Sequence, residues 1–407
     1  MRDDRVTIRF WAFGNEGENV QALIPEFERD NPGIHVMTQQ IPWTAAHEKL
    51  LTGFAGDATP DVCQLGNTWI PEFAVLNALE PLGTYVTIAG ESGLPDFFSG
   101  VVKMNVIDST LYGIPWYVDT RVLYYRKDIL GDAGFSRPPR TWAEMLRMCQ
   151  VIKTRAKSRG ILRYPIFLPT NEWVPVIILG VQAGGHFLKD GNTRGNFSGK
   201  EFTRAFSFLT SMYRDEYSPT GMSLITNLYN SFADGLICMY ITGPWNIGEF
   251  RHRIPPALQD AWMTAPLPSL DDQIPGASLP LGTSLVIFRA SKHKSEAWTF
   301  IRFLTARQQM VNFYRITGNL PPRQSAWTDS SLRANVYMRA FYDQLQRVDP
   351  LPLIPEWEQV VIRLQQYVEL AATGTKTVDE TLHEFDREVD RMLEKRRWIV
   401  EQHRAGP

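Results

Sequence analysis

Residues 6–41 of this chain read VTIRFWAFGNEGENVQALIPEFERDNPGIHVMTQQI, and their pattern decides the fold class. Residues 6–12 are rich in β-branched and aromatic side chains, which predicts a strand. The Asn31-Pro32-Gly33 sequence ends the next segment, and residues 34–41 predict a second strand. Between the two strands, four apolar residues recur at the spacing of one helix face: Val20, Leu23, Ile24 and Phe27.

The same alternation continues with a helix over about residues 44–55 and a short buried strand at 61–65. Strand, helix, strand, helix, strand is typical of a mostly parallel sheet with helices on both faces. The sequence therefore predicts an α/β fold for the first part of the chain.

The alternation restarts after Gly113. We expect one long strand at 112–127, a hairpin at 185–197, a helix at 200–214 and a strand at 235–240. Thr141 and Glu144 have the spacing of a capping box that opens a helix extending to about residue 156. A strand at 283–289 and a helix at 295–304 follow. The tail is predicted to be helical because Leu382, Phe385, Val389 and Leu393 form an apolar stripe.

Composition excludes several classes of function. The net charge of −2 provides no electrostatic attraction for nucleic acid. No stretch is apolar over the ~18 residues that a membrane span requires. Residues Met1–Asp4 do not start a signal peptide, so the protein is either cytoplasmic or exported with its leader already removed. The three cysteines, Cys63, Cys149 and Cys238, lie in apolar sequence and are expected to be buried rather than disulfide-bonded.

Catalytic and metal-binding motifs are not apparent. The sequence has no HExxH, paired CxxC, GxSxG or calcium-loop pattern, so we expect neither a metal nor a cofactor. A glycosidase carboxylate pair remains an alternative, because only its separation in space would identify it. The 12 Trp and 14 Tyr residues are more informative, because an indole or phenol offers a flat apolar face to an amphipathic ligand.

Read in chain order, a series of short motifs resembles the extracellular solute-binding proteins of carbohydrate-uptake ABC transporters, the maltose/trehalose-binding group. The resemblance covers nearly the whole chain, and its strength lies in the preserved order of weak motifs. They are FWAF (10–13), NPGI (31–34), PDV (60–62), LGNTW (65–69), YGIPWYVD (112–119), YYRKD (124–128), PPRTWAE (138–144), AGG (183–185), GPW (243–245), EAWTFI (296–301) and TGNLP (317–321).

This resemblance implies a two-lobed, type II periplasmic-binding-protein-like fold with a ligand cleft and hinge between the lobes. Pro-rich strips at 265–280 and 320–322 are expected to cross between lobes. We assign residues 1–117 plus 281–320 to the first lobe and 118–280 plus 321–407 to the second. The resemblance also implies a monomer that is exported to the periplasm, binds a carbohydrate, delivers it to membrane permease subunits and catalyses no reaction.

Sugar recognition requires aromatic planes for the C–H faces of the ring and acid or amide groups for its hydroxyls. We therefore searched strand ends and helix starts for such residues. In the first lobe these are Glu16, Trp43, Thr44, Asn67 and Trp69, with Tyr117 and Asp119 at the first crossing between lobes and Gly282 and Thr283 after the second crossing. Glu16 is alternatively only a helix N-terminal charge. Asp119 is expected either to face the cleft or to pair with Arg121, and Gly282 and Thr283 to offer backbone N–H groups.

In the second lobe the candidates are Glu172, Trp173, Trp245 and Trp357. Trp245 is the strongest stacking candidate, although each of these tryptophans is alternatively part of the core. Several aromatic residues suggest more than one sugar ring, and the family resemblance favours a disaccharide such as maltose or trehalose. A polyol, glycerol phosphate, a polyamine or iron remains an alternative solute. A phosphate ester would require a basic cluster that the candidate set lacks.

Overall fold

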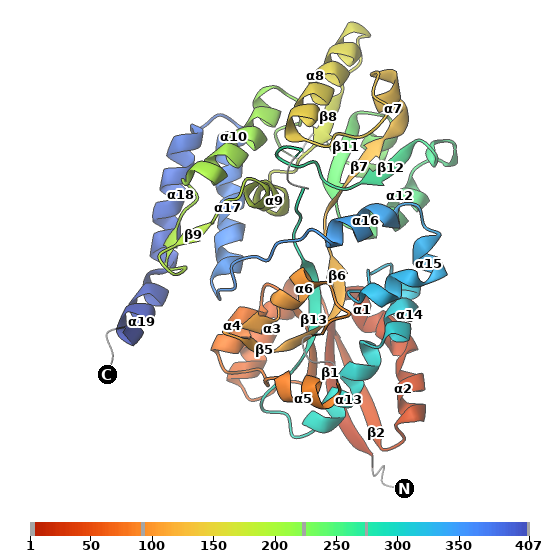
Figure 1. Ribbon diagram of the computed structural model, residues 1–407, viewed down its shortest axis with the longest axis vertical. Helices are drawn as coiled ribbons and strands as arrows, with labels where there is room; N and C mark the ends of the chain where they lie inside the picture. The colour runs from red at the N-terminus through yellow and green to blue at the C-terminus, as the bar shows by residue number, and fades with distance from the viewer. Residues whose placement is uncertain (1–4, 91–93, 222–224, 273–275, 405–407) are drawn as a thin grey trace. The chain divides into compact units, whose positions relative to one another are not determined.

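The computed structural model describes residues 5–90, 94–221, 225–272 and 276–404, and the chain forms two compact units (Figure 1). Unit 1 comprises Met1–Asp119 and Pro280–Asn335, and unit 2 comprises Thr120–Leu279 and Val336–Pro407. The chain thus passes from one unit to the other three times. Met1–Asp4, which we inspected for a signal peptide, and Pro275 of the first Pro-rich strip lie outside the described residues.

Unit 1 is built on a five-stranded sheet with the order β2-β1-β3-β13-β6. The first three strands are parallel, as predicted: β1 (Val6–Phe13), β2 (Ile34–Ile41) and β3 (Val62–Gly66). The later strand β13 (Leu281–Ile287) is antiparallel to both β3 and β6 (Gly113–Asp119). A chain segment that is distant in sequence therefore completes the sheet that the N-terminal alternation begins.

The first predicted helix is interrupted. The structure has α1 (Gly14–Asn19), the 3-10 turn η1 (Val20–Ala22) and α2 (Ile24–Asp30) in its place. Pro25 lies in the first turn of α2, where its missing N–H costs no helical hydrogen bond, so the helix restarts there. The four apolar residues of the stripe are nevertheless all buried, because their spacing still places them against the sheet.

The remaining elements of unit 1 cover the sheet and the loops at its ends. Trp116 stacks on Phe313 at 4.5 Å in its core, and Phe10 packs edge-on against Phe300. These elements are α3 (Trp43–Ala55), α4 (Ile70–Val75), α5 (Gly83–Ile88), α6 (Ser99–Lys103), β4 (Val106–Ile107), β5 (Thr110–Leu111), α13 (Lys294–Leu304), α14 (Arg307–Thr317), η3 (Gln324–Thr328) and α15 (Ser330–Arg333).

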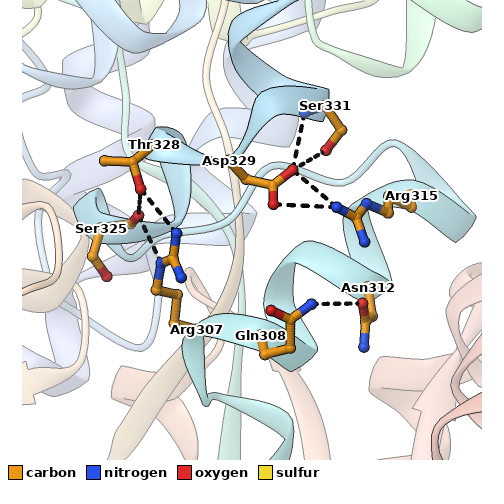
Figure 2. A network of polar contacts seen from close by, with 8 residues as sticks. All are labelled: Arg307, Gln308, Asn312, Arg315, Ser325, Thr328, Asp329 and Ser331. Atoms are coloured by element: carbon orange, nitrogen blue, oxygen red, sulfur yellow. Dashed lines mark hydrogen bonds and ion pairs between the residues drawn. The ribbon is translucent and has the colours of Figure 1, made fainter.

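Residues 321–335, which we assigned to the second lobe, belong to unit 1. Figure 2 shows the reason: two arginines of α14 hold this segment. Arg315 Nη2 donates to both carboxylate oxygens of Asp329 at 3.1 Å, and Arg307 reaches the Ser325 carbonyl and the Thr328 hydroxyl. The 320–322 strip therefore lies within unit 1, and the third passage between units is at 335/336.

Unit 2 contains a four-stranded sheet with the order β12-β7-β11-β8. Its strands are β7 (Val122–Arg126), β8 (Tyr164–Phe167), β11 (Ile237–Thr242) and β12 (Trp262–Ala265). The single strand predicted over 112–127 is in fact two strands, because β6 pairs with β13 in unit 1 whereas β7 pairs with β11 and β12 in unit 2. A run of β-rich sequence does not reveal where a chain changes sheets.

Helices make up most of the rest of unit 2. The hairpin of β9 (Leu188–Lys189) and β10 (Arg194–Gly195) is confirmed, with Asp190, Gly191 and Asn192 all at positive φ in its turn. The helices are α7 (Lys127–Asp132), α8 (Trp142–Ser158), α9 (Val174–Gln182), α10 (Lys200–Arg214), α11 (Leu228–Ala233), α12 (Trp245–Arg253), η2 (Pro256–Leu258), α16 (Met338–Leu345), α17 (Trp357–Ala372), α18 (Val378–Met392) and α19 (Glu394–Arg404).

The capping box predicted at the start of α8 forms only in part. Thr141 caps α8 by accepting from Glu144 N, but the Glu144 carboxylate binds Arg137 and the Arg140 N–H instead of closing a capping box. The box occurs at Thr377 and Glu380, where both reciprocal hydrogen bonds open α18. The apolar stripe of that helix is confirmed, since Leu382, Phe385 and Val389 are fully buried.

The buried character predicted for all three cysteines is confirmed. Burial raises the pKa of the Cys63 thiol well above its ordinary value, so this group remains an uncharged apolar side chain. Among the described helices, none combines the length and the apolar composition that crossing a bilayer demands.

Asp128 supports the buried guanidinium of Arg126, and its removal should destabilise unit 2. Arg126 donates to both Asp128 oxygens and to two carbonyls near the end of α11. Burial opposes the ionisation of Asp128, but the Arg126 hydrogen bonds outweigh this effect and lower the pKa of the carboxyl. We expect Asp128→Asn to cost about 1 kcal/mol at pH 7, a small value because the carboxylate is half exposed to screening solvent.

The same pair predicts a pH dependence. A carboxyl with a lowered pKa in the folded protein stabilises it above the unfolded pKa, ~3.9, and this contribution disappears as the pH falls through the lower folded value. The difference between the wild type and Asp128→Asn in urea unfolding should therefore shrink from pH 7 to pH 3. A difference that is constant over this range would contradict the role of the ionised pair.

Candidate functional site

In unit 1, three aromatic rings gather at the carboxyl ends of the parallel strands. Phe13 ends β1, Trp43 begins α3 after β2, and Trp69 follows β3. The Trp43 ring lies 5.1 Å from Phe13 and 5.8 Å from Trp69, both edge-on. The Trp43 side chain is 37% exposed, and Thr44 beside it is exposed too. Parallel strands that end together thus concentrate apolar planes at one sheet edge.

Polar groups from four segments of unit 1 form a second cluster. Glu16 in the first turn of α1 accepts a hydrogen bond from Asn319 Nδ2 at 3.1 Å. Gln64 Nε2 donates to the Tyr117 hydroxyl at 3.2 Å, and Gln64 Oε1 accepts from Phe13 N. Burial and the nearby Glu16 carboxylate raise the pKa of Tyr117 well above its ordinary value, so this phenol remains a hydrogen-bond donor.

Three candidates hold strands of unit 1 together. Asn67 is 1% exposed, and its side chain joins the Pro280 carbonyl to the Ser284 hydroxyl. Thr283 is equally buried within β13. Gly282 adopts φ +116°, and a Cβ there would meet the Tyr117 carbonyl at 2.5 Å, so the close pairing of β13 with β6 requires glycine. We interpret these residues as supports for their neighbours.

Asp119 ends β6 and is partly exposed, and its charge also raises the pKa of Tyr117. Glu16, Tyr117 and Asp119 are thus electrostatically coupled within unit 1. The buried phenol hydrogen-bonds to Glu16 and holds it in place, and the two carboxylates provide acceptors of the kind that a hydroxyl-rich ligand requires.

In unit 2, Trp245 begins α12 directly after β11 and Gly243-Pro244. Its indole is 47% exposed, which is unusual for so large an apolar side chain. The Arg121 guanidinium lies 4.6 Å from the centre of this ring, and Arg121 Nη2 donates to Glu172 Oε1 at 3.2 Å. Glu172 therefore neutralises the charge of Arg121, whose guanidinium lies over the Trp245 ring.

The other candidates of unit 2 differ in position. Trp173 is partly exposed and precedes α9 next to Glu172. Trp357, by contrast, is 1% exposed and packs against Phe187 at 5.5 Å. Its side chain belongs to the core of unit 2, and we remove it from the proposed ligand-binding set. Pro355-Glu356-Trp357 does begin a helix, but the helix directs the indole inward.

Sequence reasoning missed several polar groups. Gln64 donates a hydrogen bond to Tyr117, and Asn319 donates one to Glu16. A signal for Gln64 was present in the sequence, because it is the one amide within the buried strand predicted at 61–65. Tyr240, whose phenol is influenced by the Glu172 charge, was also missed. Burial raises its pKa to about 12, with a further contribution from Glu172. Arg121 was considered only as a partner of Asp119.

Comparison with known proteins agrees with this organisation. Residues 13–311 match the family described as bacterial extracellular solute-binding protein. The structure of the sugar-binding protein MalE from the phytopathogen Xanthomonas citri is 44% identical and superimposes with a TM-score of 0.94, covering 98% of this chain and 100% of that one. The predicted two-lobed periplasmic-binding-protein fold is confirmed by these matches.

Two further relatives are named as binding proteins. An ABC transporter solute-binding protein from Thermotoga lettingae, bound with α-D-tagatose, is 25% identical with a TM-score of 0.77 and covers 95% of this chain and 100% of its own. The diacetylchitobiose-binding protein DasA of Streptomyces coelicolor is 26% identical over 366 residues, 87% of this chain and 81% of DasA. The chain thus belongs to the bacterial extracellular solute-binding protein family, as its collinear motifs predicted.

Proposed function

We propose that this protein binds a neutral sugar, most simply a disaccharide such as maltose or trehalose, and delivers it to the permease subunits of an ABC importer. The main support is that each unit has an exposed indole and at least one carboxylate at the ends of its strands. In unit 1 these are Trp43, Glu16 and Asp119, and in unit 2 they are Trp245 and Glu172. The Xanthomonas citri relative, itself named a sugar-binding protein, supports the same ligand class.

The charges of the site favour an uncharged ligand. The arginine at Trp245 is paired with Glu172, and the remaining charged candidates are acids. An anionic phosphate ester would meet these carboxylates and be repelled, whereas sugar hydroxyls can donate to them. Acceptors that a bound ligand covers also disfavour an analogue that lacks the matching hydroxyl.

We propose that one sugar contacts both the unit 1 and the unit 2 candidate residues, and transport follows from this. A ligand that contacts each unit would favour the arrangement in which both sets are satisfied, and the permease would recognise that arrangement. We propose that the protein acts as an exported, periplasmic monomer that returns its ligand chemically unchanged.

Calorimetric titration tests the ligand class. We expect maltose or trehalose to bind and to raise the melting temperature, and glycerol phosphate to do neither. Glucose, maltotriose and sorbitol distinguish one ring, three rings and an open-chain polyol. Stabilisation by the phosphate ester without stabilisation by any sugar would refute the proposal. Chromatography of the sugar after long incubation distinguishes binding from hydrolysis, because an enzyme would consume it.

A further inference from the structure

Three of the candidate tryptophans, Trp43, Trp69 and Trp245, share one structural feature: each indole lies directly against a glycine backbone. A Cβ on Gly14 would lie 2.6 Å from Trp43 Cδ1, and one on Gly66 would lie 3.3 Å from Trp69 Cδ2. A Cβ on Gly243 would overlap the benzo ring of Trp245, with Cε3 at 2.6 Å and two further ring atoms still closer. At positions 14 and 243, any side chain would therefore occupy the space of the ring.

The turn that contains Gly243 is held rigidly by buried hydrogen bonds. The Tyr124 hydroxyl donates to the Gly243 carbonyl at 2.8 Å, and Tyr124 is fully buried in the core of unit 2. Asn246 Nδ2 donates to the Thr242 hydroxyl at 2.7 Å, which ties the end of β11 to the start of α12. Because both sides of the turn are fixed, the glycine presents a fixed surface to the indole.

The position of the Trp245 ring is thus defined by two contacts within unit 2. The Gly243 backbone meets its benzo ring, and the Arg121 guanidinium lies near its centre. Arg121 is itself 7% exposed and is fixed by Glu172. An indole that is half exposed would otherwise sample several rotamers, and ordering it only when the ligand binds would cost free energy.

We infer that Gly243 and Gly14 are positioning residues for ligand binding, because the lack of a side chain lets Trp245 and Trp43 lie on the backbone in fixed planes. This inference rests on the proposed function only in naming a sugar as the ligand. The glycines contact the ring. Their effect on affinity is therefore exerted entirely through the indole.

Gly243→Ala is the sharper test, because Gly243 does not need positive φ, whereas Gly14 adopts φ +53° and would be strained by any side chain. We expect the new methyl group to push Trp245 toward solvent and to weaken sugar binding about tenfold, close to the loss on removing the ring. The matched control is Gly248→Ala in α12, the helix that Trp245 begins, where a Cβ meets no atom within 4 Å beyond its own helix backbone and affinity should be unchanged.

A double-mutant cycle separates positioning from general damage. In a Trp245→Ala background, Gly243→Ala should have no further effect on affinity or stability, because the ring that it displaces is gone. Losses that add up would overturn the inference. If Gly243→Ala alone folds poorly, the double variant should regain the stability of Trp245→Ala. Persistent instability would place the fault in the backbone and also overturn the inference.

A readout without ligand makes the inference independent of the proposed function. Acrylamide quenching of Trp245 is obtained as the difference between each protein and its Trp245→Phe counterpart. We expect this quenching to increase in Gly243→Ala and to be unchanged in Gly248→Ala. If no sugar binds to the wild type but the quenching increases, the proposed ligand is wrong and the ring-positioning role stands. Unchanged quenching refutes that role whatever the ligand is.

Discussion

Replacing Trp357 with alanine is expected to lower the free energy of unfolding by about 3–5 kcal/mol, because the change empties a large site in a closed core. The indole is 1% exposed and packs against Phe187 in the core of unit 2. Surrounding side chains that are held by other contacts can refill such a cavity only in part. The affinity of the molecules that remain folded should be unchanged, since the side chain is not accessible to a ligand.

Trp357→Phe is the matched control. The Trp357 Nε1–H has no hydrogen-bond partner among the described residues, so phenylalanine removes an unsatisfied polar group while retaining most of the apolar contact. We expect it to lose about 1 kcal/mol, much less than the alanine variant. Urea unfolding followed by circular dichroism measures both variants. A fully stable Trp357→Ala protein that had lost its ligand affinity would return this residue to the binding set.

Local patterns predicted the elements of this fold better than their connections. The buried stripes of α2 and α18 follow from periodicity, which depends only on near neighbours in sequence. Two errors concern long-range pairing. One strand was predicted over 112–127 because both halves are β-rich, and no local signal marks the change of sheet after Asp119. Residues 321–335 were misassigned because proline strips resemble linkers, while the Arg315–Asp329 pair that anchors them forms only in three dimensions.

For the candidate site, the structure gives the place and burial of each residue, and the ligand-binding roles stay predictions. Strand ends directed attention to Trp43 and Trp245, because topology brings such ends to one edge of a sheet, and both indoles are exposed there. Burial distinguishes exposed residues from supports such as Asn67, and burial depends on the folded chain rather than on the residue type. The contact between Arg121 and Trp245 joins residues far apart in the chain, so no spacing rule could have indicated it.

Replacing Trp245 with alanine is expected to leave folding almost intact and to weaken sugar binding about tenfold or more. With the indole 47% exposed, its removal creates no internal cavity, and the loss of stability should be within about 1 kcal/mol. A bound sugar would cover that exposed area, so the apolar contact contributes to affinity and not to folding. The expected loss of affinity has a second cause. Without the indole, the Arg121 guanidinium loses the ring that now covers it and would face the ligand beside Glu172.

Trp398→Ala supplies the comparison, because Trp398 is 61% exposed on α19 and follows no strand end. Both variants lose an exposed indole, so a general effect of surface tryptophan would appear in both. Titration calorimetry should show full affinity for Trp398→Ala and the tenfold loss only for Trp245→Ala. Equal affinities in the two variants would mean that the Trp245 plane is not used. Trp43 in unit 1, whose ring also lies on a glycine, would then be the first residue to replace.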